Sequence, residues 1–383
     1  MNFTFTEEQL LIRDMAERFF RDEYDLDTRR KHQAMPGGFC PETWAQFAEM
    51  GWLALGIPED LGGVGGGSVE TAILMEAMGG GLAVEPFLST VVLGGGLLIR
   101  GGSDEQKGDL LPKLAAGELL LAFGYGEPQS RYDLNDVATT AKADGDGYVL
   151  DGGKCVVLHA GTADKIAVTA RTSGDARDRA GITVFLIDAD APGVTVRDYP
   201  TVDGLRAGDV TLSGVKAGAE AVVGEVGNGL ELTEAVIDRA AALIAVEAAG
   251  VMAATTQCTV DYLKERKQFG RPLGDFQALQ HRMTEMYMET ELTRWLGYMA
   301  VVRQDGDDRP PAARAAAQAK AKAGQAGRLI GQEAVQLHGG MGVTDEMFVS
   351  HLFKRLTMID HVFGDAAHQV ERLADMDVGN AAA

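Results

Sequence analysis

Four long helical runs joined by short turns make up the sequence after Gly229. The runs cover residues 230–267, about 275–303, 311–337 and about 346–375. The third run is rich in Ala, which favours helix, and Pro310-Pro311 suits its first turn, where a helix needs no backbone donor. Long antiparallel helices with short connections pack against one another, so this part of the chain predicts a four-helix bundle.

The sequence before Gly229 divides into a helical part and a β part. Residues 1–120 read as helices separated by loops, beginning at a capping-box-like Thr6 that is followed three residues later by Gln9. From residue 121 on, short apolar runs such as Ile182 to Ile187 alternate with Gly-Asp and Ser-Gly-Asp turns, which is typical of antiparallel strands. We therefore expect an α+β multidomain chain. Its three domains are helical over 1–120, β over 121–228 and a helical bundle over 229–383.

The net charge of −21 and the use of cysteine disfavour several classes of function. So acidic a chain is a poor partner for nucleic acid or for an anionic membrane, and no apolar run approaches membrane-spanning length. Cys40, Cys155 and Cys258 lie far apart, with neither metal-ligand nor disulfide-scaffold spacing. The N-terminus has no basic stretch followed by an apolar core. We expect a cytoplasmic protein with no metal site and no nucleic-acid or membrane partner.

The stretch from Arg266 to Leu273 closes the first long helix with a cation, followed by Phe269-Gly270 and Pro272. That order predicts a helix stop and a turn. A guanidinium group at such a corner suits phosphate, because its donors match phosphate oxygens two at a time. The alternative is an ordinary helix C-terminus, where a cation complements the helix dipole.

Three motifs, taken together with the domain order, resemble the acyl-CoA dehydrogenase family. They are RKQFG at 266–270, FQALQ at 276–280 and EAVQLHGGMG at 333–342. The loop IPEDLGG at 57–63 also matches the family, so the likeness covers essentially the whole chain. The resemblance implies that the central β domain is an antiparallel β-barrel between the helical domain and the bundle. It also implies FAD as the cofactor.

In that family, the flavin lies across a subunit boundary, and this chain resembles the half that reaches over from the neighbouring subunit. The resemblance implies that Arg266 pairs with the FAD pyrophosphate, with Gln268 and Phe269 beside it. Gln336, Gly339 and Gly340 would line the adenosine end. We call these six residues the clamp residues.

The half that holds the flavin ring departs from the family pattern. Gly126 stands where typical members have a Thr that hydrogen-bonds the ring. In the later strand motif, Val156 replaces a Trp and Leu158 replaces a second Thr. Three ring contacts are lost together, and each lost side-chain hydrogen bond is worth roughly 0.5–1.5 kcal/mol.

The catalytic base departs from the pattern as well. Phe363 occupies the position of the usual Glu, and Asp365, two residues on, is more typical of a turn or cap. Some relatives take the base from the first bundle helix, at the position of Ala240. Asp238 is the candidate base there and Glu247 a weaker one. Asp238 with Arg239 would otherwise be an exposed pair, and Glu247 we expect to be buried and partnered.

This pattern most resembles the smaller subunit of heteromeric bacterial members of the family, the pimeloyl-CoA dehydrogenase type. The implied reaction is α,β-dehydrogenation of an acyl-CoA thioester, in which a carboxylate removes the α proton and the β hydride passes to the flavin. The implied partners are an unlike large subunit in an α2β2 assembly, the acyl-CoA substrate, and an electron-transfer flavoprotein or similar acceptor.

Three alternatives stay open. The first is a self-sufficient homotetramer that uses Asp238 or Glu247 as its base. The second is a non-catalytic homologue that binds acyl-CoA or serves as a structural subunit. The third is a flavin oxidase or monooxygenase relative with a substrate other than a CoA thioester.

Overall fold

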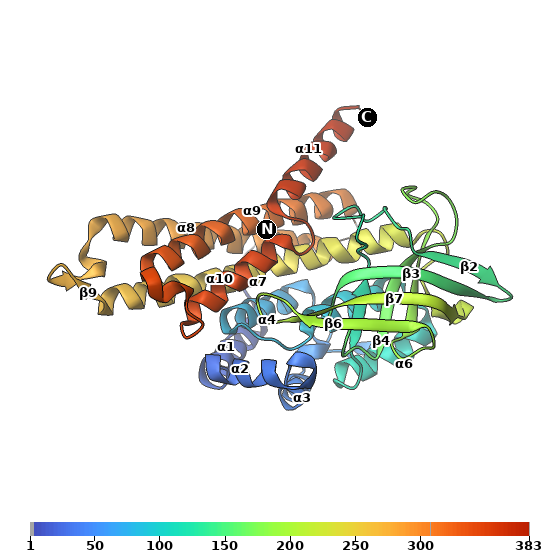
Figure 1. Ribbon diagram of the computed structural model, residues 1–383, viewed down its shortest axis with the longest axis horizontal. Helices are drawn as coiled ribbons and strands as arrows, with labels where there is room; N and C mark the ends of the chain where they lie inside the picture. Colours follow the sequence, from blue (N-terminus) through green and yellow to red (C-terminus); the bar gives the residue numbers. More distant parts are fainter. Residues whose placement is uncertain (1–3, 307, 383) are drawn as a thin grey trace. The chain divides into compact units, whose positions relative to one another are not determined.

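The computed structural model describes residues 4–306 and 308–382, with helices in the first and last thirds of the chain and a β-sheet between them (Figure 1). Contacts between residues divide the chain into two compact units. The helical unit consists of residues up to 31, 68–83 and from 241 onward. The sheet unit consists of residues 32–67 and 84–240.

The N-terminal third is helical, as the sequence predicts. Its helices are α1 (Glu7–Asp22), α2 (Leu26–Ala34), α3 (Pro41–Glu49), α4 (Ser68–Gly81), the π-helix η4 (Leu88–Gly95), α5 (Gly96–Gly101) and α6 (Asp104–Ala115). The capping box at the start of α1 is present: the Gln9 backbone N–H donates to Thr6 Oγ1 over 3.2 Å, and Gln9 Oε1 accepts from the Thr6 backbone over 3.0 Å. Two backbone donors at the helix start are thereby satisfied.

The central third forms one eight-stranded sheet. Its strands are β1 (Leu121–Gly124), β2 (Thr140–Asp144), β3 (Gly147–Leu158), β4 (Lys165–Arg171), β5 (Ile182–Asp188), β6 (Val194–Pro200), β7 (Arg206–Ala217) and β8 (Val222–Val223). They lie in the order β6-β7-β3-β2-β4-β5-β8, with β1 beside β4. Leu150, Val168, Phe185 and Val210 contribute to the apolar core of the sheet.

The expected closed antiparallel barrel is not found in the part of the chain that the structure describes. The ladder has two ends, β6 and β8, and the pairs β1–β4 and β2–β4 are parallel. β8 is only two residues long, too short to carry the ladder further. β6 alternates between exposed and half-buried residues, as expected for a solvated edge strand.

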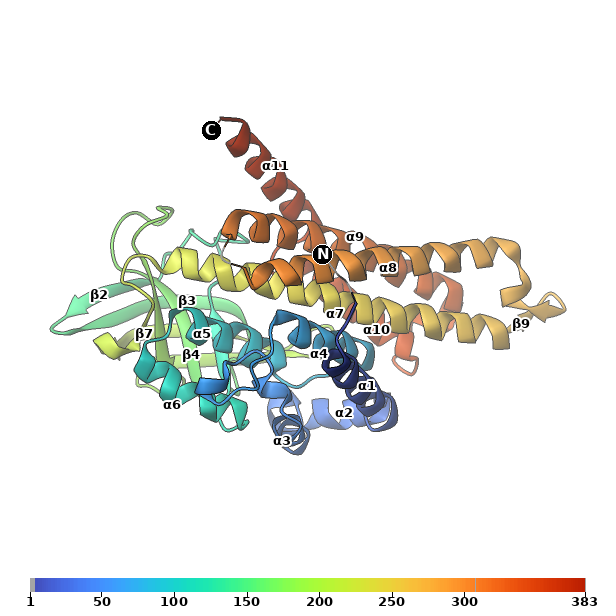
Figure 2. The same ribbon diagram turned by 180° about the vertical axis from the view of Figure 1, so that it is seen from behind.

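Among the described residues, five α-helices make up most of the last third of the chain. They are α7 (Gly229–Glu265), α8 (Gln277–Gln304), α9 (Arg309–His338), α10 (Phe348–His361) and α11 (Ala366–Ala382), and the short strands β9 (Lys267–Gln268) and β10 (Arg271–Pro272) link α7 to α8. Within the helical unit α9 packs against α8, α10 and α11, which Figures 1 and 2 show from opposite sides. The prediction of one helix over 346–375 is wrong. Phe363 and Gly364 have φ of 61° and 92°, which no right-handed helix accommodates, so the chain turns between α10 and α11.

Two glycines let α4 and α7 cross at van der Waals contact of their backbones. A Cβ atom at Gly250 would lie 1.9 Å from the carbonyl oxygen of Glu76, and one at Gly79 would lie 2.4 Å from that of Glu247. No side chain fits at either place. None of the described helices is both long and apolar enough to cross a membrane.

Candidate functional site

The corner after α7 has the stop and turn that the sequence predicts. β9 and β10 pair as a hairpin, in which Gln268 lies opposite Arg271. Phe269 and Gly270 have φ of 55° and 82°, the two positive values of a type I′ turn. The Leu273 N–H donates to the Arg266 carbonyl over 2.8 Å and closes the corner. Phe269 is 89% exposed, so its side chain points away from the core of the helical unit.

The second group of clamp residues lies at the end of α9. Gln336, Gly339 and Gly340 are all exposed, and Gly339 ends the helix with φ of 61°. A Cβ atom at Gly339 or Gly340 would meet nothing within 4 Å. The backbone there is open to a ligand that approaches closely.

A ring stack joins these two places. The Tyr262 ring lies on the His338 ring with centroids 4.4 Å apart and planes inclined by 24°. The Tyr262 hydroxyl also donates to the His338 carbonyl over 3.3 Å. The structure therefore brings together the ends of α7 and α9, from which the predicted clamp residues project.

The contact between Tyr262 and His338 was not predicted from the sequence. Their positions beside the clamp residues could have indicated it, since Tyr262 lies one helical turn before Arg266 and His338 lies between Gln336 and Gly339. His338 is 3% exposed, and its Nδ1 lies 2.8 Å from the Ala334 carbonyl. Burial lowers the pKa of His338, although the Ala334 carbonyl opposes the shift. The ring is therefore neutral at pH 7, with Nδ1 as the donor.

The clamp residues fit the diphosphate and adenosine part of FAD. Arg266, Gln268 and Phe269 are exposed, and the Gly339-Gly340 backbone is open. A guanidinium group and uncrowded backbone N–H groups are suitable ligands for a diphosphate. All of them face outward, which suits a ligand carried by another chain.

The positions expected to hold the flavin ring fit that part of FAD poorly. Val156 lies in a bulge where Cys155 and Val156 face Asp209 alone on β7. The Val156 N–H donates to Asp209 Oδ1 over 3.3 Å, and φ of Val156 is 54°. Neither Val156 nor Leu158 carries a polar side chain, and Gly126 has none at all. The side-chain hydrogen bonds that a flavin ring would need from these positions cannot form.

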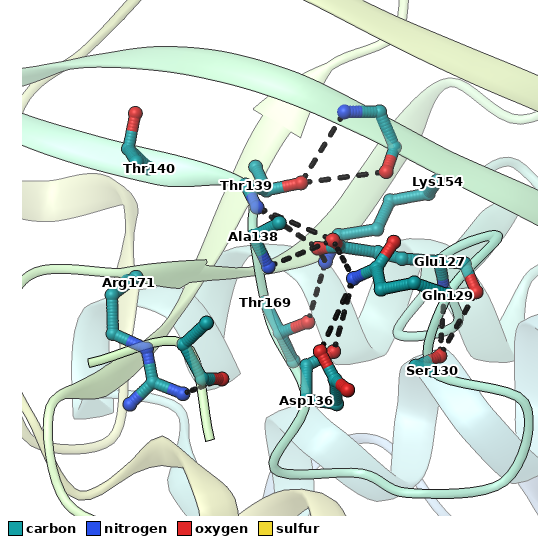
Figure 3. A network of polar contacts seen from close by, with 12 residues as sticks. Glu127, Gln129, Ser130, Asp136, Ala138, Thr139, Thr140, Lys154, Thr169 and Arg171 are labelled. Carbon is teal, nitrogen blue, oxygen red and sulfur yellow. Dashed lines mark hydrogen bonds and ion pairs between the residues drawn. The ribbon is translucent and has the colours of Figure 1, made fainter. Parts of the chain in front are cut away.

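A buried polar network lies between Gly126 and this bulge, and Figure 3 shows its side chains converging. Lys154 Nζ donates to Glu127 Oε1 over 2.6 Å and to Thr169 Oγ1 over 2.9 Å. Glu127 also accepts from the backbone of Ala138 over 2.8 Å and of Thr139 over 3.1 Å. The network ties the loop after β1 to β3, so the backbone that carries positions 126 and 156 is braced.

The two charged groups of this network are strongly perturbed. Burial raises the pKa of Glu127, but the charge and hydrogen bond of Lys154 outweigh burial and lower that pKa to about 2. Burial lowers the pKa of Lys154 to about 8, against the attraction of Glu127. Both groups are charged at pH 7, as a buried pair must be to satisfy each other.

The turn at the expected base position is held rigidly. Lys320 Nζ, fully buried, donates to the carbonyls of Asp360 and Gly364, each over 2.8 Å. Gln369 donates to the Phe363 carbonyl over 2.6 Å. Asp365 Oδ1 accepts from the His368 backbone over 2.9 Å and so caps the start of α11. Burial lowers the pKa of Lys320 to about 8, with Asp360 and Asp365 opposing the shift.

The two alternative bases lie in different surroundings. Asp238 is 1% exposed and Arg239 is 9% exposed, so the interpretation of them as an exposed surface pair is wrong. Glu247 is buried, as expected, and its Oε1 accepts from Arg355 Nε over 2.7 Å and lies 2.6 Å from Arg355 NH2. The Glu247 carboxylate is thus engaged by the Arg355 guanidinium group. Within residues 4–306 and 308–382, no group of three or more His, Cys, Asp or Glu side chains could hold a metal ion.

Three family models match the chain in succession. The model of the acyl-CoA dehydrogenase N-terminal domain matches residues 6–118, that of the middle domain 122–215 and that of the C-terminal domain 227–376. The probable acyl-CoA dehydrogenase YngJ of Bacillus subtilis (strain 168) is 30% identical over 378 residues, which are 97% of this chain and 98% of that protein.

Two solved structures of similar proteins carry names that join two components. The Tcur3481-Tcur3483 steroid acyl-CoA dehydrogenase, solved as a variant, has a TM-score of 0.89 at 30% identity, covering 98% of this chain and 99% of that one. The ChsE4-ChsE5 complex from Mycobacterium tuberculosis has a TM-score of 0.88 at 28% identity, covering 98% of each chain.

Proposed function

This chain belongs to the acyl-CoA dehydrogenase family, and from that premise we propose that it is the partner subunit of a heteromeric member. The family consists of flavoprotein oxidoreductases whose cofactor is FAD. In this proposal, an unlike chain seats the flavin ring and supplies the base. The clamp residues of this chain, Arg266, Gln268, Phe269, Gln336, Gly339 and Gly340, hold the diphosphate and adenosine.

The observation that carries the proposal is the contrast between the two halves of the FAD site. The clamp residues are exposed at the ends of α7 and α9, whereas Gly126, Val156 and Leu158 offer the ring no side-chain hydrogen bond. At the base position, Phe363 is 7% exposed and cannot take up a proton. A chain that contributes only the clamp residues needs a second chain that binds the flavin ring and supplies the base.

The reaction in this proposal is α,β-dehydrogenation of an acyl-CoA thioester. Bound FAD supplies the acceptor for the β hydride. The part of this chain is to neutralise the diphosphate with Arg266 and to let the Gly339-Gly340 backbone approach the adenosine end. An electron-transfer flavoprotein or a similar acceptor would then reoxidise the assembly. The ChsE4-ChsE5 complex and the Tcur3481-Tcur3483 enzyme support an assembly of unlike chains, α2β2 in our proposal.

The domain division that we propose follows the sequence. A helical domain over 1–120, a β domain over 121–228 and a bundle over 229–383 would each contribute one function. The β domain would pack beside the flavin, and the bundle would carry the clamp residues on α7 and α9.

A second candidate function is a self-sufficient homotetramer with Asp238 as the base. Its support is the position of Asp238, which is 1% exposed on α7 and lies two residues from Ala240, the position expected for the base. A non-catalytic acyl-CoA-binding homologue would also explain Phe363.

Expression of this chain alone and together with the dehydrogenase chains encoded beside it tests these candidates. We expect the chain alone to be colourless and inactive toward acyl-CoA, and one co-expressed pair to be yellow and active with an acceptor dye. A chain that alone retains FAD in a one-to-one ratio and oxidises acyl-CoA would disprove the proposal and favour the homotetramer. A chain that forms no active pair with any neighbour would favour the non-catalytic homologue.

Substitution in the active pair tests the clamp itself. Arg266→Ala should lower the affinity for FAD by about tenfold or more, because a charge-assisted contact to the diphosphate is lost. Arg303→Ala, at an exposed arginine near the end of α8, is the matched control and should leave the affinity unchanged. Equal affinities in the two variants would remove Arg266 from the site.

A further inference from the structure

The rings of Tyr262 and His338 connect two segments that are 76 residues apart in the sequence. Tyr262 belongs to the last turn of α7, and the N–H of Arg266 donates to its carbonyl over 2.9 Å. His338 is the last residue of α9 and directly precedes Gly339. Each ring is therefore attached through a few backbone bonds to one group of clamp residues.

The His338 ring is fixed on several sides. The ring Nδ1 donates to the Ala334 carbonyl over 2.8 Å, and the backbone carbonyl of His338 accepts from the Tyr262 hydroxyl. Gly342 lies close to this residue, since a Cβ atom at Gly342 would lie 3.0 Å from His338 Cβ. His338 is 3% exposed, and Tyr262 stacks on its ring. Ring and backbone bonds together set the distance between the two helix ends.

The side-chain contacts of the clamp residues on the hairpin are to nearby residues. Phe269 is 89% exposed and meets the Phe276 ring edge-on, with centroids 6.1 Å apart, and the Gln268 side chain donates to the neighbouring Lys267 carbonyl over 2.8 Å. Gly339 and Gly340 have no side chain to pack. Their joint position consequently depends on what holds the end of α7 to the end of α9.

We propose that Tyr262 and His338 are positioning residues, whose stacked rings hold the two groups of clamp residues in register before FAD arrives. This inference rests on the proposed function of the clamp residues. Binding to a surface that is already ordered costs less conformational entropy, so a preorganised site binds its ligand more tightly. The stack should affect affinity for the diphosphate and adenosine part of FAD and leave the flavin ring untouched.

The experiment compares FAD with FMN, which has the ring and one phosphate but no diphosphate and no adenosine. Binding of each to the cofactor-free assembly is followed by flavin fluorescence for the wild type, Tyr262→Leu, Tyr262→Phe and His338→Phe. Tyr262→Leu removes the stack, whereas the two Phe variants keep it and each remove one hydrogen bond. Tyr287→Leu, at a tyrosine on α8 that is 59% exposed, is the matched control.

We expect Tyr262→Leu to lower the affinity for FAD by about tenfold and to leave the affinity for FMN unchanged, because only the diphosphate and adenosine of FAD reach the clamp residues. Tyr262→Phe and His338→Phe should restore most of the lost affinity, and Tyr287→Leu should behave as wild type. An equal loss for FAD and FMN, or a fall in Tm with FAD affinity intact, would make the pair merely structural and overturn the inference.

Arg266→Ala separates this inference from the proposed function. If Arg266→Ala lowers the affinity for FAD and Tyr262→Leu does not, the positioning role is wrong and the proposed function stands. If neither variant lowers the affinity for FAD, the clamp residues do not bind FAD and both proposals fail. Should this chain alone bind FAD, the heteromeric function fails, and the same comparison on that assembly still decides the role of the stack.

Discussion

Val156 is a β-branched residue in left-handed backbone, with φ of 54° and a side chain that is 53% exposed. Such a conformation is strained by roughly 1–3 kcal/mol. Asn tolerates it better, so Val156→Asn should raise the free energy of unfolding by about 1 kcal/mol. Chemical denaturation measures the difference.

Val226→Asn is the control for this prediction, because Val226 is also 53% exposed but lies outside left-handed backbone. It should change the stability little. Equal changes in the two variants would mean that the bulge at Val156 is relaxed and that its geometry has no stored strain.

His338 makes stability depend on pH. Its pKa in the folded chain lies below the unfolded value of about 6.5, because burial disfavours the charged ring. The corresponding stability is fully present above about pH 6.5 and is lost as the pH falls through the lowered pKa. Thermal unfolding between about pH 5 and 7.5 should therefore show a steeper decline for the wild type than for His338→Phe. Parallel curves would contradict the assignment.

At this scale, the sequence predicted what local chemistry decides. The stop and turn after Arg266, the Thr6 capping box and the burial of Glu247 with a partner all follow from neighbouring residue types. The burial of Asp238 was not predicted, because it depends on tertiary packing that residue types alone do not reveal. The pairing of Tyr262 with His338 was missed for the same reason. The roles given to the clamp residues remain predictions.

Among the elements, the β1 loop and β3 depend on one buried ion pair. The side chains of Lys154 and Glu127 are 0% and 3% exposed. Glu127→Gln leaves the Lys154 ammonium buried without its counter-charge and should lower the free energy of unfolding by roughly 3–5 kcal/mol. Adding Lys154→Met should recover most of the loss, because the remaining site no longer buries a charge. A double-mutant cycle by urea unfolding measures the coupling, and additive losses would contradict it.

The turn between α10 and α11 receives two hydrogen bonds from Lys320, a side chain of α9. Lys320→Met leaves the Asp360 and Gly364 carbonyls without their buried donor and should lower stability by roughly 2–4 kcal/mol. Hydrogen exchange of α11 should accelerate more than that of α7. Lys322→Met, on the same helix, removes a partly exposed ion pair with Glu289 and should lower stability by at most about 1 kcal/mol. Unchanged protection of α11 would show that the turn does not need Lys320.

The two wrong predictions about elements have physical causes. The prediction of one helix over 346–375 passed over a local signal, because Gly364 is typical of a helix stop and Asp365 of a cap. A barrel and an open sheet have the same alternating strands, and their difference lies in whether the edges pair. β8, with two residues, is too short to reveal its role in a sequence pattern.

For the whole molecule, the proposed assembly sets the amount of cofactor. If every flavin needs a ring half from one chain and the clamp residues from the other, the active pair should bind one FAD for each pair of unlike chains. Flavin absorbance against protein concentration, with the subunit ratio from a denaturing gel, measures this. One FAD for every chain would mean that this chain also seats a ring of its own.

The surroundings of Gly126 leave room for a side chain. A Cβ atom added there would meet nothing closer than the Cys155 carbonyl oxygen, at 3.7 Å, and the ion pair of Glu127 still braces the loop. In the proposed heteromer, a Thr introduced at position 126 would therefore need no change of the backbone. Directed evolution of a ring contact in this chain has its starting point there.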